Sequence, residues 1–203
     1  MRAAVRATQL WLERVVIGLT LCPWAKPAHD RAAVHFVHVA AADAEVVFAS
    51  ILAEMENIRA GNSETTLLVV PNAFEDDFAD FNEFLQNVEE YLQDEAMDDE
   101  FQLVGFHPCF QFADEDSVDP SNWVNRSPWP TIHILRQDDV TKAVTDNPKL
   151  AEEVPSNNQR VLRAMGVDTI RDLVSTAVQD SGGVAGDRES TVAASSALCG
   201  CDG

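Results

Sequence analysis

The chain has 203 residues, of which 14 are Lys or Arg and 34 are Asp or Glu, so its formal net charge at pH 7 is −20. This length fits one domain followed by a tail, and the apolar fraction of 46% is ordinary for a globular protein. A surface this acidic repels the phosphate backbone of nucleic acids and anionic membranes, so we expect neither as a partner.

The N-terminal segment is predicted to be an amphipathic helix of the domain itself. Apolar residues recur at helical spacing from Leu12 to Cys22. Glu13 and Arg14 interrupt the apolar run, which argues against a secretory signal peptide, and no segment has the roughly 20 uncharged apolar residues of a membrane span. The four cysteines are unevenly placed and indicate no disulfide framework. We therefore expect a cytoplasmic protein, with organelle targeting by the first residues left open.

Strands and helices then alternate along the chain. A β-rich run covers Ala33–Val39, and a helix is predicted for Asp43–Gly61 with Asp43 as a plausible N-cap. The continuous apolar run Thr65–Pro71 is typical of a buried strand. Apolar residues spaced by three and four in Phe74–Leu92 predict a helix that faces the core.

Two further strands, Phe101–His107 and Thr131–Arg136, flank a long loop. After them, the capping-box pattern Ser156–Gln159 predicts the start of a helix that Gly166 ends. Asp168 is a candidate cap for one more helix. We expect a single domain over residues 1–180, and the Gly, Ser and Ala composition of residues 181–203 predicts a disordered tail.

The order of these elements predicts an α/β fold. Strands that alternate with helices imply right-handed crossovers for the first three strands, with helices covering the sheet. We therefore expect a sandwich with a four-stranded sheet, largely parallel or mixed. The direction of the fourth strand stays open, because a long loop can reach either end of the sheet.

The loop between the last two strands indicates a functional site. A connection of about twenty residues without regular structure is uncommon in a compact domain unless it is functional or disordered. Four large aromatic residues argue against disorder, because their rings require burial: Phe110, Phe112, Trp123 and Trp129.

Several segments resemble the domain-of-unknown-function family 1415. They are the run from Trp11 to Lys26, Glu64–Asn72, the Gly-Phe-His-Pro motif at 105–108, and the block from Asn122 to Arg136 with its Asn-Arg-Ser-Pro-Trp-Pro sequence. The resemblance covers roughly residues 7–166 and implies no established reaction. It implies that six polar residues belong to a shared pattern: Cys22, His107, Asn125, Arg126, Ser127 and His133.

Cys22 and His107 are the candidate catalytic residues. Cys22 precedes Pro23, a natural first residue of a helix, and a thiolate that faces helix N–H groups is reactive because its pKa is lowered. The alternative is a small buried side chain that ends an apolar stripe. His107 lies where a strand meets the loop, a position at which open α/β sheets bind ligands.

The candidate substrate-binding residues include Arg126, whose guanidinium could clamp a ligand carboxylate or phosphate or instead pin the loop. His133 lies inside the fourth strand and is either a core histidine or part of the site. His35 and His38 are interpreted as structural. The remaining binding candidates surround Arg126 or wall the predicted pocket: Asn125, Ser127, Trp24 and Trp129.

No metal ligand is assigned and the cofactor stays unknown. Cys22, His107, Cys109 and His133 could form a zinc set, but their spacing matches no familiar signature. A glycine-rich phosphate loop, a nucleophile elbow and a dinucleotide fingerprint are all lacking.

The leading hypothesis is a cytosolic enzyme that acts on a small anionic molecule through Cys22, His107 and Arg126. The first alternative is a non-catalytic module that binds a small ligand or a metal. The second is a purely structural loop whose polar side chains satisfy buried backbone groups. The sequence alone does not decide whether the protein is an enzyme, nor its oligomeric state.

Overall fold

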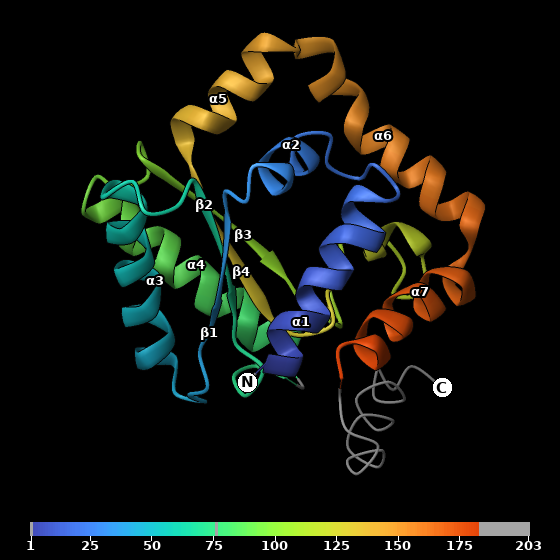
Figure 1. Cartoon of the computed structure of the whole chain (residues 1–203), viewed down its shortest axis with the longest axis horizontal. Helices are drawn as coiled ribbons and strands as arrows, with labels where there is room; N and C mark the ends of the chain where they lie inside the picture. Colours follow the sequence, from blue (N-terminus) through green and yellow to red (C-terminus); the bar gives the residue numbers. More distant parts are fainter. Residues whose placement is uncertain (1, 76, 183–203) are drawn as a thin grey trace.

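The computed structural model describes residues 2–75 and 77–182 (Figure 1). Helices and strands follow one another as the sequence predicts for an α/β fold. In chain order the elements are α1 (Arg2–Trp11), the π-helical turn η1 (Leu12–Ile17), α2 (Ala25–Asp30), β1 (Val34–His38), α3 (Ala44–Arg59), β2 (Thr65–Val69), α4 (Phe78–Asp94), β3 (Phe101–Phe106), the 3₁₀ helix η2 (Pro120–Val124), β4 (Thr131–Arg136), α5 (Gln137–Asp146), α6 (Pro148–Met165) and α7 (Val167–Asp180).

The sheet is mixed, with strand order β1-β2-β4-β3. β1 runs parallel to β2, whereas β4 runs antiparallel to both of its neighbours, β2 and β3. The first three strands therefore share one direction, and β4 is inserted against them between β2 and β3. This confirms the four-stranded α/β sandwich and gives the direction of the fourth strand, which the sequence left open.

One face of the sheet is covered by α3 and α4, which provide the two crossover connections (Figure 1). Gly105 on β3 lets α4 approach closely, because a Cβ there would lie 2.4 Å from Leu85 Cδ1. We call this apolar layer the α3–α4 core. Its fully or almost fully buried residues include Ile51, Met55, Ile58, Leu68, Phe81, Val88, Leu92, Phe101, Ile132 and Ile134.

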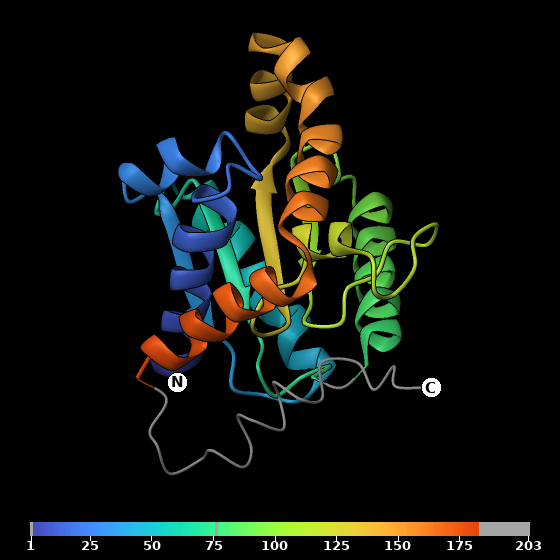
Figure 2. The same cartoon turned by 90° about the vertical axis from the view of Figure 1, so that its right-hand side faces the viewer.

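The opposite face is covered by α1, η1 and the C-terminal helices α6 and α7. We call the second apolar layer the α1–α7 core, and it also receives residues from the long loop. Figure 2 shows this loop beside α6, on the side away from α2. The buried residues of this core are Trp11, Leu12, Val15, Val16, Leu21, Leu67, Trp123, Leu162, Ile170 and Val174.

Helix starts follow local capping chemistry. Asp43 caps α3 as predicted, because its carboxylate accepts a hydrogen bond of 2.8 Å from the Glu45 N–H. α4 begins later than its apolar pattern suggested, since Asp77 is the cap and Phe74 lies before the helix with a φ of +62°. The aromatic ring of Phe74 nevertheless packs on Phe81, which explains why the pattern continued through it.

The predicted start of the following helix is wrong. Ser156 lies inside α6, which begins at Pro148, and its hydroxyl donates to the Glu153 carbonyl instead of capping a helix. Gly166 ends α6 as predicted, with a φ of +78°. The next helix, α7, was also expected, but Gly166 and not Asp168 occupies its N-cap.

The predicted disordered tail falls mostly on residues 183–203, which lie outside the described residues, as do Cys199 and Cys201. Within the described part of the chain, no helix combines the length and apolar character needed to cross a membrane.

Candidate functional site

His107 follows the last residue of β3 and is fully buried. Its Nε2 lies 2.7 Å from the Phe74 carbonyl, and its Nδ1 accepts a hydrogen bond of 3.0 Å from the Cys109 N–H. The carbonyl requires a donor, so Nε2 carries the proton of a neutral imidazole. Burial lowers the pKa of His107, although the Phe74 carbonyl and the charge of Asp77 act in the opposite sense. Both ring nitrogens are therefore engaged by the protein itself.

Arg126 holds the long loop together from inside. Its Nε donates to the Phe110 carbonyl and its Nη2 to the Ser117 carbonyl, each over 2.9 Å. The guanidinium also lies over the ring of Trp123, 5.3 Å from its centroid. Asn122 bridges the same segments, since its amide accepts from the Phe112 N–H and donates to the Asp116 carbonyl.

The remaining candidates from the loop, Asn125, Ser127 and Trp129, follow Asn122 closely in the chain. The Asn125 carbonyl accepts a hydrogen bond of 3.1 Å from the His107 N–H. Ser127 is buried and its hydroxyl donates to the Trp129 carbonyl over 2.6 Å. The Trp129 indole N–H is buried and has no acceptor among the described residues.

Cys22 and His133 lie on the other face of the sheet from the His107 ring. Cys22 packs against the α1–α7 core, whereas the His107 ring contacts Phe78 and Phe81 of α4. Burial raises the pKa of the Cys22 thiol, and the N–H groups of Trp24 and Ala25 only partly oppose this. The thiol and the imidazole that sequence analysis paired are thus separated by the sheet.

His133 is held by a neighbouring strand. Its Nε2 lies 2.8 Å from the Thr65 hydroxyl, which itself donates to the Ile134 carbonyl. The hydroxyl must therefore accept from His133, and Nε2 carries the proton. Burial lowers the pKa of His133 to about 4. Trp24, which precedes α2, is half-buried at the helix start.

No group of three or more His, Cys, Asp or Glu side chains among residues 2–75 and 77–182 is arranged to hold a metal ion. The zinc set considered from the sequence is therefore not assembled in the described part of the chain.

The long loop does border a cleft, on the side that faces α6. The cleft has a volume of about 440 Å³. Its apolar walls come from Phe112 and Val124 of the loop and from Val154 and Pro155 of α6. The polar lining residues are Asp114, Glu115, Ser121, Asn158 and Gln159. We call this the loop–α6 cleft.

Two of these polar residues are buried and incompletely bonded. Ser121 is 1% exposed and Asn158 is 6% exposed. The Asn158 Nδ2 donates to the Leu21 carbonyl over 2.9 Å, which fixes the orientation of the amide and leaves Oδ1 without a donor among the described residues. The Ser121 Oγ makes no hydrogen bond of good geometry there, although the hydroxyl is near enough to the Asp119 carboxylate to lower its pKa.

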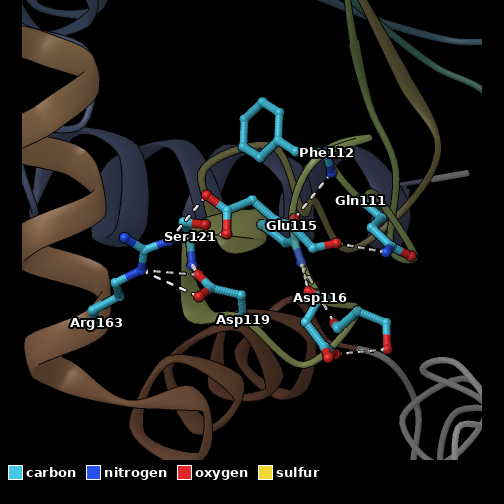
Figure 3. Close-up of polar contacts among 9 residues, drawn as sticks. Gln111, Phe112, Glu115, Asp116, Asp119, Ser121 and Arg163 are labelled. Atoms are coloured by element: carbon cyan, nitrogen blue, oxygen red, sulfur yellow. Dashed lines mark hydrogen bonds and ion pairs between the residues drawn. The ribbon is translucent and has the colours of Figure 1, made fainter.

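An ion-pair network ties α6 to the loop beside the cleft (Figure 3). Arg163 donates to both carboxylate oxygens of Asp119 over 3.2 Å and to both of Glu115 over 3.0 Å. Asp119 also caps η2 by accepting from the Ser121 N–H. The adjacent Ser121 hydroxyl and N–H, together with Arg163, lower the pKa of Asp119 against the opposing effect of burial. These ion pairs hold the loop and α6, which form the two sides of the cleft, in a fixed relative position.

A third histidine, His35, lies at two further clefts and was interpreted from the sequence as structural. It lines cavities of about 460 Å³ and 780 Å³ at the β1 edge of the sheet. Its Nδ1 lies 3.1 Å from the carboxylate of Glu54, a buried residue that also accepts from the Thr66 hydroxyl. Glu54 lies on α3 and His35 on β1, so only the fold reveals the pair.

Ser121 and Asn158 were not among the sequence candidates. Serine and asparagine are common surface residues, and Asn158 stood inside a pattern that was interpreted as a helix start. Only the packing of α6 against the loop buries both side chains at one place.

Residues 3–172 match the family described as "Protein of unknown function (DUF1415)". Since the match spans far more than half of the chain, the chain belongs to this family, which confirms the resemblance inferred from its motifs. No curated protein and no solved structure matches the chain.

Proposed function

We propose that this DUF1415 member binds a small organic molecule in the loop–α6 cleft. The observation that carries the proposal is the buried Asn158 Oδ1, which has no hydrogen-bond donor among the described residues and belongs to a residue that lines the cleft together with the buried Ser121. Leaving a buried polar group without a partner costs about 1–3 kcal/mol. Native proteins rarely retain such groups unless a water, an ion or a ligand satisfies them.

The size and chemistry of the cleft support the same conclusion. Small-molecule sites typically enclose about 300–1,000 Å³ and combine apolar walls with a few placed polar groups. The loop–α6 cleft has about 440 Å³, walls that include Phe112 and Val154, and the buried polar residues Ser121 and Asn158 in its lining. A loop fixed on a rigid scaffold is a common location for binding residues.

The enzymatic hypothesis from the sequence stays a prediction, and the geometry favours binding over it. Catalysis by Cys22 and His107 requires both groups to face one substrate. They lie on opposite faces of the sheet, and both ring nitrogens of His107 are bonded within the protein. An anionic substrate was expected because of Arg126, which bonds to loop carbonyls and is not among the residues that line the cleft.

The proposal is tested by titrating the ¹⁵N-labelled full chain with benzyl alcohol, a probe with an apolar ring and one hydroxyl. We expect saturable shifts in the amide resonances of the cleft residues, including Phe112, Ser121 and Asn158. The variant Val154→Trp should abolish these shifts, because the indole occupies the space beside α6 that the probe needs.

The matched control is Val144→Trp, a substitution at a side chain that is 45% exposed on α5 and does not line the cleft. This variant should bind the probe as the wild type does. Shifts that are confined to other regions, or that survive in Val154→Trp, would contradict the assignment of the cleft.

A further inference from the structure

We propose that the ligand of the loop–α6 cleft is a cation, an amine or amidine attached to a compact apolar group. This inference rests on the proposed binding function and adds the chemical class of the ligand.

The charged side chains that line the cleft are all acidic. Asp114 and Glu115 line it, and no Lys, Arg or His is among the lining residues. Arg163 compensates Glu115 from outside, whereas Asp114 has no cationic partner within 4.0 Å among the described residues. The formal net charge of −20 adds a long-range attraction for cations. An anionic ligand would meet repulsion at the mouth of the cleft.

The buried side-chain oxygen of Asn158 requires a hydrogen-bond donor. Asn158 Oδ1 is an acceptor, and its orientation is fixed because Nδ2 is committed to the Leu21 carbonyl. A carboxylate or a phosphate offers only acceptors and leaves this oxygen unsatisfied. An ammonium group carries up to three donors and can supply the one that Asn158 Oδ1 lacks.

The apolar walls define the rest of the ligand. Phe112 is 36% exposed and lies in the lining together with Val124, Val154 and Pro155. Aliphatic and aromatic walls around a cleft of this volume suit one small ring or a branched alkyl group. The face of Phe112 also attracts a nearby cation.

The test compares three probes of almost equal shape by calorimetry and by the same amide shifts: benzylamine, benzyl alcohol and benzoate. We expect benzylamine to bind most tightly and benzoate most weakly, with a ratio of roughly tenfold or more between the two. The advantage of benzylamine should shrink as sodium chloride is added, because salt screens the exposed Asp114.

A variant that removes the charge of Asp114 isolates the electrostatic contribution to the affinity for benzylamine. Asp114→Asn keeps the shape of the side chain and should weaken benzylamine roughly threefold to fivefold, while leaving benzyl alcohol unchanged. The control Asp94→Asn removes an equal charge from the end of α4, which covers the opposite face of the sheet, and should leave both affinities unchanged.

The outcomes separate the ligand class from the site. Benzoate binding as tightly as benzylamine, with shifts at the cleft, overturns the cationic ligand and leaves the proposed binding function intact. If none of the three probes shifts the cleft amides, the proposed function fails. Equal losses in Asp114→Asn and Asp94→Asn would reduce the preference to net charge and overturn the role of Asp114.

Discussion

The polar residues that the sequence singled out are hydrogen-bonded to other groups of the protein. His107 bonds to Phe74 and Cys109, Arg126 bonds to loop carbonyls, and His133 bonds to Thr65. These residues were predicted from the sequence to form a site, and a structural role was the alternative for each of them. The sequence does not distinguish a structural role from a role in a site, because the hydrogen-bond partner of each side chain is set by the fold and not by neighbouring residues.

His133 gives the fold a dependence on pH. Its pKa is about 4 in the folded chain and 6.5 when unperturbed. Between these values the unfolded chain binds a proton that the folded chain excludes, so the free energy of unfolding falls as the pH drops from 6.5 towards 4. The full difference amounts to roughly 3 kcal/mol.

We therefore expect His133→Gln, measured by urea unfolding at pH 7 and pH 5, to lose less stability than the wild type between the two conditions. His107 contributes in the same direction in both proteins, because burial lowers its pKa as well. The difference between the two proteins isolates His133, since the many acidic residues are common to both. An identical loss of stability in the two proteins would show that His133 is accessible to protons in the folded state.

The helices and strands that were predicted best are those with a clear apolar pattern of their own. β4 was predicted with the bounds Thr131–Arg136 that it has in the structure, and the apolar stripe of α4 faces the core as expected. α5 was missed and the start of α6 was misplaced, because a capping pattern at Ser156 occurs inside a longer helix. α5 has no buried residue, so no apolar stripe marks it in the sequence. α6 does carry a local start signal, since Pro148 occupies its first turn after Asn147, but the capping pattern at Ser156 was given more weight.

The long loop is the element whose role is most open to a direct test. Arg126 pins it through two carbonyl hydrogen bonds and a contact with Trp123. Arg126→Lys keeps the charge but loses the planar fork, so we expect the free energy of unfolding to fall by roughly 1–3 kcal/mol.

Arg171→Lys is the matched control, because the Arg171–Asp168 pair on α7 is exposed and should be worth less than about 1 kcal/mol. If Arg126 is instead the ligand clamp considered from the sequence, its lysine variant should unfold like the wild type. It should then lose any thermal stabilisation by small carboxylates or phosphates.

For the whole molecule, the arrangement of the two cores explains where a ligand can bind. The sheet separates the α3–α4 core from the α1–α7 core, and the long loop spans from the end of β3 to the start of β4. α6 packs against this loop at η2 (Figure 2). The loop–α6 cleft lies between them. The fold class followed from the alternation of elements along the chain, whereas the cleft depends on a contact between segments about forty residues apart.

The central claim is that the loop–α6 cleft holds a small molecule, and a crystal structure of the full chain soaked with benzylamine tests it most directly. We expect the ring of the probe between Phe112 and Val154 and its nitrogen about 3 Å from Asn158 Oδ1. A probe bound only elsewhere, with Asn158 Oδ1 satisfied by the protein itself, would contradict the account.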